Sequence, residues 1–165
     1  MAITTIEDLF IHELSDIYSA EKQLTKALPH LARASSSPDL AGAFESHLEE
    51  TRGQVERIDE IVEILGVRLK RMKCAAMEGL VEEGKEVIDE IEKGPLRDVA
   101  LIGGGNRVEH YEIAGYGTLI ALANQLGYAK AVPLLQATLK EEKAADEKLT
   151  LLAEQLGKQQ SAERA

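Results

Sequence analysis

Residues 5–34 read TIEDLFIHELSDIYSAEKQLTKALPHLARA, and the fold class can be read first from this stretch. Its apolar residues recur every three or four positions, which is the period of an α-helix with one buried face. Thr5 is a suitable N-cap, and Glu7 and Asp8 in the first turn favour the same helix start. The apolar stripe consists of Ile6, Phe10, Leu14, Ile17, Leu24, Leu28 and Leu31. The stretch therefore predicts one long amphipathic helix.

The helical period continues through most of the remaining chain, and no run alternates in the manner of a β-strand. Ser37 followed by Pro38 predicts the start of a second helix, which stops at Gly66. Further helices are expected over residues 75–93, 96–126 and 129–156, the last of them ending at Gly157. Residues 158–165, KQQSAERA after Gly157, are expected to form a disordered tail.

Four long helices and one short helix define the expected fold class, which is all-α. The long helices would form a four-helix bundle of two antiparallel hairpins, with the short fifth helix in the crossover between them. A long connection between the hairpins is typical of ferritin-like bundles. The chain has 165 residues, so we expect a single domain over residues 1–157.

Composition excludes several classes of protein. The chain carries 19 Lys and Arg against 29 Asp and Glu, a formal net charge of -10. This acid excess argues against binding nucleic acid or an anionic membrane surface, since both need a cationic face. The single cysteine, Cys74, favours a reducing compartment. Neither a signal peptide nor a membrane span is recognisable, so a cytoplasmic location is expected.

Several acidic residues fall on the apolar faces of the expected helices. Glu21 lies in the middle of the first stripe, and Glu112 is central in the 96–126 helix with Glu109 one turn away. In the last helix Glu142 is central and Asp146 follows one turn later. Buried carboxylates repel one another, and the desolvation of each costs several kcal/mol. They must be protonated, paired with cations or bound to metal.

The second long helix also turns polar side chains inward. Thr51 is at the centre of its stripe and His47 is inward too, while Glu50 and Gln54 lie toward the edge. Each long helix thus offers ligand-type groups at mid-length. A pair of metal ions bridged by oxygen ligands from four helices is the simplest way to neutralise them.

Five segments occur in order along residues 5–156. They are HELSDIYSAEKQL (12–24), HLEETRGQVERI (47–58), KCAAMEGLVEE (73–83), VEHYEIAGYGTL (108–119) and LKEEKAADEKL (139–149). Together they resemble the YciF/YciE family of bacterial ferritin-like stress proteins. This resemblance implies a ferritin-like bundle, a homodimer and a stress-associated role whose biochemical activity is not established.

The ferritin-like di-iron pattern has a Glu on the first and third long helices and ExxH on the second and fourth. The resemblance implies that four glutamates occupy these positions: Glu21, Glu50, Glu112 and Glu142. Glu109 with Glu112 also forms the ExxE motif of rubrerythrin-like members. The resemblance therefore implies a di-iron type of site.

Both histidines of the pattern are missing, because Gly53 and Ala145 stand at their positions. His47 and Asp146, each one turn from a pattern glutamate, are the expected substitutes. An oxygen-rich site of this kind favours iron or manganese over zinc. The sequence leaves two functions open: a metal protein that handles iron or peroxide, and a structural or interaction protein that has lost metal binding.

Overall fold

This computed structural model describes residues 2–163, with side chains up to Gln159. Within this part of the chain there are five helices and no strand. They are α1 (Ile6–Ala34), α2 (Pro38–Leu65), α3 (Ala75–Glu90), α4 (Pro95–Leu126) and α5 (Val132–Glu163). The all-α fold class expected from the sequence is therefore confirmed.

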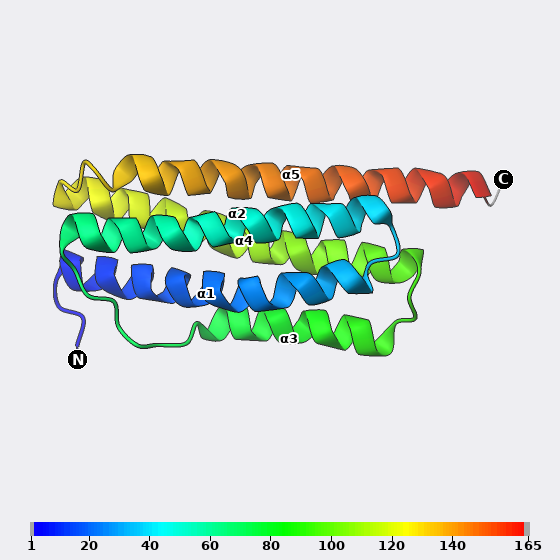
Figure 1. Cartoon of the computed structure of the whole chain (residues 1–165), viewed down its shortest axis with the longest axis horizontal. Coiled ribbons are helices and arrows are strands. Elements are labelled where there is room, and N and C mark those ends of the chain that lie inside the picture. The colour runs from blue at the N-terminus through cyan, green and yellow to red at the C-terminus, as the bar shows by residue number, and fades with distance from the viewer. Residues whose placement is uncertain (1, 164–165) are drawn as a thin grey trace.

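The four long helices form a bundle of two antiparallel hairpins (Figure 1). One hairpin is α1 with α2, and the other is α4 with α5; α1 packs on α4, and α2 packs on α5. The short helix α3 belongs to the crossover between the hairpins and lies outside the bundle against α1 and α4. This topology is the one expected from the long connection in the sequence. None of the described helices is both long enough and apolar enough to span a membrane.

The helix boundaries follow from local chemistry at most of the predicted positions. The Asp8 amide donates to Thr5 Oγ1 at 3.0 Å while the Thr5 amide donates to Asp8 Oδ2 at 3.1 Å, which makes a capping box at the start of α1. Ser37 caps α2, with Pro38 in the first turn. Gly66, with φ 63°, ends α2 in the left-handed conformation that glycine adopts without strain.

The end of α3 and the start of α5 differ from the positions predicted from the sequence. Helix α3 ends at Glu90 instead of residue 93, where the guanidinium of Arg97 donates to the carbonyl oxygens of Ile88 and Ile91 at 3.0 and 2.6 Å. These carbonyls therefore need no further helical turn. Helix α5 begins at Val132 instead of residue 129, which puts Pro133 in the first turn, where its missing N–H is harmless.

The C-terminal end of α5 also differs from the expectation. The helix continues through Gly157 to Glu163, so Gly157 does not end it. A glycine within a helix costs about 1 kcal/mol relative to alanine but does not break the helix. Residues 158–163 are helical rather than disordered, and residues 164–165 of the expected tail lie outside the described part.

The core has two apolar clusters with a polar layer between them. One cluster includes Leu24, Phe44, Leu101 and Leu149, and the other includes Ile17, Ile58, Leu119 and Leu135. On each long helix the sequence interval between its members of the two clusters contains buried polar residues. These are Glu21 on α1; His47, Thr51 and Gln54 on α2; Glu109 and Glu112 on α4; and Thr138 and Glu142 on α5. The bundle therefore encloses these polar groups between two apolar layers.

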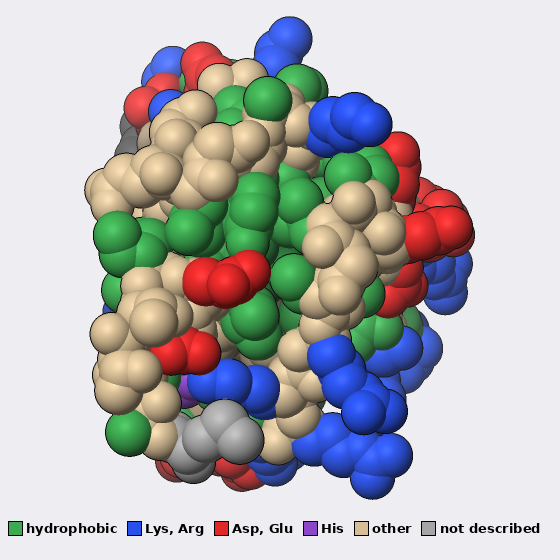
Figure 2. Space-filling view, turned by 90° about the vertical axis from the view of Figure 1, so that its left-hand side faces the viewer, with side chains coloured by type: hydrophobic (Ala, Val, Ile, Leu, Met, Phe, Trp, Pro, Cys, Tyr) green, Lys and Arg blue, Asp and Glu red, His purple; other side chains and the backbone are tan. Residues whose placement is uncertain are grey.

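One end of the bundle presents apolar side chains to solvent. This end carries the start of α1 and the end of α2 (Figure 1), where Ile3, Ile6 and Ile64 are 43%, 47% and 40% exposed. Figure 2 looks onto this end and shows apolar side chains filling much of its middle, with acidic side chains among them. Exposed apolar surface of this kind is typical of a protein contact.

Candidate metal centre

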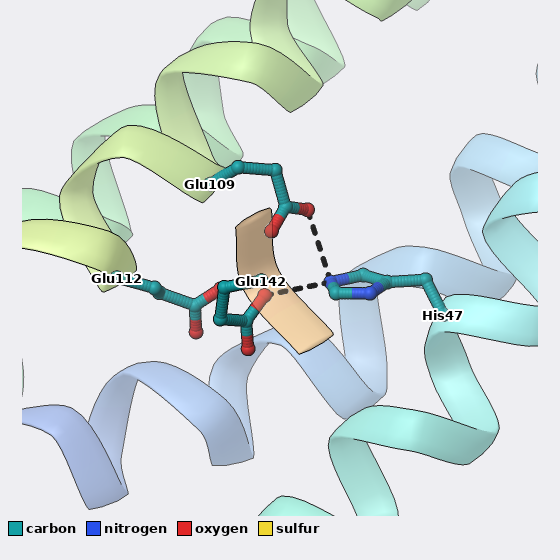
Figure 3. Close-up of side chains that lie close together, drawn as sticks. All are labelled: His47, Glu109, Glu112 and Glu142. Carbon is teal, nitrogen blue, oxygen red and sulfur yellow. Dashed lines mark ion pairs between the residues drawn. The ribbon is translucent and has the colours of Figure 1, made fainter. Parts of the chain in front are cut away.

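Four buried side chains from three helices converge in the polar layer. His47 on α2, Glu109 and Glu112 on α4, and Glu142 on α5 each offer one ligand atom, and these atoms lie within 4.8 Å of one another (Figure 3). Glu112 and Glu142 are 0% exposed, Glu109 is 2% exposed and His47 is 5% exposed. All four were expected from the sequence to be metal ligands, and the fold brings them together in a group that can hold a metal ion.

The ring of His47 faces the carboxylates with one nitrogen and the protein surface with the other. Its Nε2 atom lies 3.0 Å from Glu109 Oε1 and 3.8 Å from Glu142 Oε2. The close approach to Glu109 lacks the alignment of a hydrogen bond. On the other side, Nδ1 lies 3.4 Å from Glu50 Oε2. His47 therefore connects the buried group to a carboxylate at the surface.

Many polar atoms in this layer have no hydrogen-bond partner among the described residues. They are His47 Nε2, Glu21 Oε2, Thr51 Oγ1, Gln54 Oε1, Glu109 Oε2, and both carboxylate oxygens of Glu112 and of Glu142. Buried polar atoms in folded proteins are almost always hydrogen-bonded. No Lys or Arg in the described part of the chain forms an ion pair with these carboxylates. Such a concentration of unpartnered oxygens fits a bound cation.

Burial changes the proton affinity of the group. It raises the pKa of both Glu112 and Glu142 well above the ordinary glutamate value, and the neighbouring carboxylates add to the effect. Burial also raises the pKa of Glu21 to about 7, against the opposing influence of the Tyr116 hydroxyl and His47. The pKa of His47 would fall through burial, but Glu109 and Glu50 raise it to about 10. In the absence of a bound cation, these buried glutamates therefore hold their protons to a higher pH than exposed glutamates do.

Glu21 lies beside the four converging residues and is held from α4. Its side chain is 0% exposed, and Tyr116 donates its hydroxyl hydrogen to Glu21 Oε1 at 2.5 Å. The second oxygen, Oε2, is buried and unpartnered. Glu112 is close enough to influence the pKa of Glu21. The position predicted for Glu21, inside the bundle, is therefore confirmed, and its role as a ligand stays a prediction.

Glu50 and Asp146 lie outside the converging group. The Glu50 side chain is 43% exposed, and it lies 3.4 Å from the outer nitrogen of His47, Nδ1. Asp146 is half-buried; it accepts a hydrogen bond from Asn106 Nδ2 at 2.6 Å and lies 3.3 Å from His110 Nε2. The helical phase already put Glu50 near the edge of α2. Neighbours on α4 turn Asp146 toward the surface, which a phase estimate along α5 alone does not reveal.

Thr51 and Gln54 contribute further buried oxygen atoms that could bind a metal ion, and neither residue was among the predicted ligands. Both are 0% exposed. The Gln54 amide nitrogen donates to Glu141 Oε2 at 3.1 Å. The guanidinium of Arg57 donates to both oxygens of the same carboxylate, to Oε2 at 2.8 Å and to Oε1 at 2.9 Å. This arrangement fixes the amide and leaves Gln54 Oε1 buried without a partner. The central position of Thr51 in its apolar stripe was the signal in the sequence.

A cavity adjoins the group where a pattern histidine is missing. Its volume is ≈ 100 Å³, and it lies between α2, α4 and α5. Ala145, which stands at the position of the missing histidine, lines it together with His47, Glu50, Glu109 and Lys148. A cavity of this size holds several water molecules. The small side chain at position 145 therefore leaves space next to the proposed ligands.

Known proteins similar to this chain support the fold and the family. Residues 5–162 match the family described as a domain of unknown function, DUF892. Protein YciF of Escherichia coli K12 is 63% identical over 154 residues, which cover 93% of each protein. The crystal structure of the E. coli stress protein YciF superposes with a TM-score of 0.92 at 61% identity, covering 94% of this chain and 99% of that one.

Two further solved structures are similar. YcfI, a proposed structural protein from Rhodopseudomonas palustris, has a TM-score of 0.86 at 46% identity and covers 90% of this chain and 94% of its own. A protein from Xanthomonas campestris has a TM-score of 0.75 at 20% identity, covering 98% of this chain and 100% of its own, and supports the fold alone. The resemblance noted from the sequence is confirmed: the chain belongs to the DUF892 family, as a relative of the E. coli stress protein YciF.

Proposed function

We propose that this chain is a ferritin-like stress-response protein whose buried polar layer binds two divalent metal ions, iron or manganese. The proposed ligands are Glu21, His47, Glu109, Glu112 and Glu142. Glu50 and Asp146, which the sequence also suggested, are left outside this set because the first is exposed and the second points to α4. The stress-related role rests on similarity to the stress protein YciF.

The observation that carries this proposal is the gathering of unpartnered donors. Four ligand atoms lie within 4.8 Å of one another, and most of the oxygens in the layer lack hydrogen bonds. Leaving several buried carboxylates unneutralised is costly, whereas divalent ions satisfy them all at once. The apolar clusters lie on two sides of the layer and lower the local dielectric constant, which strengthens electrostatic attraction.

The donor chemistry favours particular metals. Four of the five proposed ligands are carboxylates and one is an imidazole, and no thiolate is among them. Carboxylates suit manganese and iron, whereas zinc sites more often use sulfur and several nitrogens. When bound, iron or manganese would supply redox chemistry toward peroxide. The chain's own contribution is to hold the carboxylates in place, with the Tyr116 hydroxyl fixing one oxygen of Glu21.

Metal analysis after reconstitution tests the proposal. The protein, purified without chelator and loaded anaerobically with Fe(II) or Mn(II), is expected to retain about two ions per chain after desalting, by analogy with di-metal carboxylate bundles. Glu142→Gln is expected to reduce retention, because it removes a carboxylate from the centre of the group. Glu147→Gln, an exposed change on the same helix, is the matched control. Wild-type protein that retains neither metal would contradict the proposal.

A structural role without metal is the second candidate. It is favoured by the absence of both pattern histidines at positions 53 and 145, and by the similarity to YcfI, which is described as a proposed structural protein. In that case, neutral replacements of the buried glutamates should leave the melting temperature unchanged or raise it in the presence of metal as well as in its absence. A rise in melting temperature on adding metal, lost in Glu142→Gln, would exclude it.

Homodimerisation and a cytoplasmic location are further parts of the proposal. The apolar end of the bundle, with Ile3, Ile6 and Ile64 exposed, supports a contact between protein surfaces. Light scattering coupled to size exclusion measures the mass directly. A mass equal to one chain at micromolar concentration would contradict the dimer, and a much larger shell would indicate a storage cage instead.

A further inference from the structure

The cavity beside Ala145 runs from the surface to the buried ligands. Ser46, Glu50, Ala144 and Lys148, on its outer side, are exposed. Phe44, His47, Glu109 and Leu149, on its inner side, are buried. His47 Nε2 and Glu109 Oε2, two of the atoms without a hydrogen-bond partner, belong to residues of this inner wall. The cavity thus connects solvent with two residues, His47 and Glu109, that each have a buried polar atom without a hydrogen-bond partner.

Three groups that bind metal ions follow one another along this cavity. The Glu50 carboxylate is 43% exposed and lies 3.4 Å from His47 Nδ1. The opposite nitrogen of the same ring lies 3.0 Å from the Glu109 carboxylate, whose side chain is 3% exposed. A carboxylate, an imidazole and a second carboxylate therefore span the distance from the surface to the interior in two short contacts.

We infer that this cavity is the access route by which a divalent cation reaches the buried centre, and that Glu50 is its outer acceptor. The inference rests on the proposed metal binding and adds a role for a residue that is not in the ligand set. A cation first held by Glu50 would pass inward by way of the His47 ring, which contacts Glu50 on one side and Glu109 on the other. Ala145 keeps the passage open because its side chain is a single methyl group. Lys148 also lines the outer side of the cavity, and because it is exposed its ammonium group is solvated and not buried beside the ligands.

A role in access differs measurably from a role in binding. A residue that only lowers the barrier to passage changes the rates of uptake and release together, so the equilibrium affinity stays constant. A ligand changes the affinity itself. Glu50→Gln and Ala145→Leu should therefore slow Co(II) uptake by the metal-free protein about tenfold, without changing the dissociation constant. The visible absorption of Co(II), followed by stopped flow, reports its arrival among protein ligands.

Matched controls are available on the same helices. Glu49→Gln removes the same charge from a neighbouring exposed residue that pairs with Arg52, and Ala137→Leu adds the same side chain to an exposed position on α5. Both controls are expected to take up Co(II) at the wild-type rate. Since Glu50 is at the surface, its replacement leaves the fold intact and keeps the test valid even where Ala145→Leu distorts α5.

The possible outcomes separate the two proposals. Slow uptake with unchanged affinity in Glu50→Gln, and normal uptake in Glu49→Gln, support the access route. Wild-type rates in both Glu50→Gln and Ala145→Leu would overturn it while leaving the metal site intact. A loss of affinity in Glu50→Gln at the wild-type rate of uptake would overturn it as well, because Glu50 would then act on the centre through His47 and not on passage. Wild-type protein that binds no Co(II) would overturn the access route together with the proposed function.

Discussion

The Nε2 atom of His47 lies 3.0 Å from Oε1 of Glu109 without the alignment of a hydrogen bond. Two donors that bind one ion at about 2.0–2.2 Å are themselves separated by about 3 Å. The distance therefore matches two ligands of a shared cation. The two side chains point toward each other across the polar layer from α2 and α4, which are not a packed pair of helices in the bundle (Figure 3).

Replacing His47 should weaken metal binding more than it disturbs the fold. His47→Gln removes the only nitrogen donor among the proposed ligands, and the Mn(II) affinity is expected to fall about tenfold or more. The measurement is a competition titration against a chelator of known affinity. His110→Gln, which changes an exposed histidine, should bind Mn(II) as the wild type does. Equal affinities for both variants would exclude His47 as a ligand.

The metal-free protein should lose stability as the pH rises. The pKa of Glu21 is raised from 4.5 to about 7 by burial, and those of Glu112 and Glu142 are raised further. Above about pH 4.5 the folded chain binds more protons at these sites than the unfolded chain does, so its free energy of unfolding falls through pH 7 and beyond. The contribution of His47, with its pKa raised to about 10, also decreases above its ordinary value near 6.5.

Thermal melts of the metal-free protein between pH 5 and pH 9 measure this dependence. Glu112→Gln resembles the protonated acid at every pH, and the curve of melting temperature against pH should be flatter than that of the wild type. An exposed change such as Glu82→Gln should leave the slope as it is. A melting temperature of the wild type that rises steadily across this range would contradict the raised pKa values.

Metal should stabilise the folded chain, and more strongly at higher pH. A ligand at a hundred times its dissociation constant adds about 2.7 kcal/mol to the free energy of unfolding, which corresponds to roughly 5–10 °C for a domain of this size. Binding must displace protons from Glu112 and Glu142, so the gain should increase from pH 6 to pH 8. Calorimetry with and without Mn(II) measures it, and Glu142→Gln should show little gain at either pH.

Two glycines of α4 should respond in opposite ways to alanine. A Cβ at position 115 would collide with the buried side chain of Ile17, whereas a Cβ at position 117 would meet nothing within 4 Å. We expect Gly115→Ala to destabilise the protein by about 1–3 kcal/mol through overpacking. Gly117→Ala should stabilise it by up to about 1 kcal/mol, since alanine is the better helix former. Urea denaturation of the two variants provides the comparison.

Asp98 should be important for joining the two hairpins. Its side chain is 1% exposed, and it accepts hydrogen bonds from the amides of Ser36 and Ser37 at 2.7 and 2.8 Å. Asp98→Ala removes both of these hydrogen bonds to a buried carboxylate and is expected to cost about 2–4 kcal/mol of the free energy of unfolding. Asp89→Ala, at an exposed position on α3, should cost less than about 0.5 kcal/mol. Similar losses in both variants would contradict the assigned role.

Much of the fold was predictable because it depends on local chemistry. The start of α1 follows from Thr5 and Asp8, and the end of α2 follows from Gly66. The end of α3 was not predictable, because it depends on Arg97 of the next helix, whose guanidinium donates a hydrogen bond to the carbonyl oxygen of Ile91. The end of α5 was missed for a different reason: Gly157 lowers helix propensity only slightly, so it is a weak stop signal.

The amino-acid sequence was sufficient to identify the helices, their inward faces and the four glutamates and one histidine that face the interior. Periodicity carries this information, since a helical residue's direction depends on its neighbours along the same helix. Which of these groups meet depends on how the helices pack against one another. Only that packing brings His47 to Glu109, excludes Asp146 from the centre, and leaves a cavity beside Ala145. These outcomes are set by distances across the bundle, which spacing along one helix does not contain.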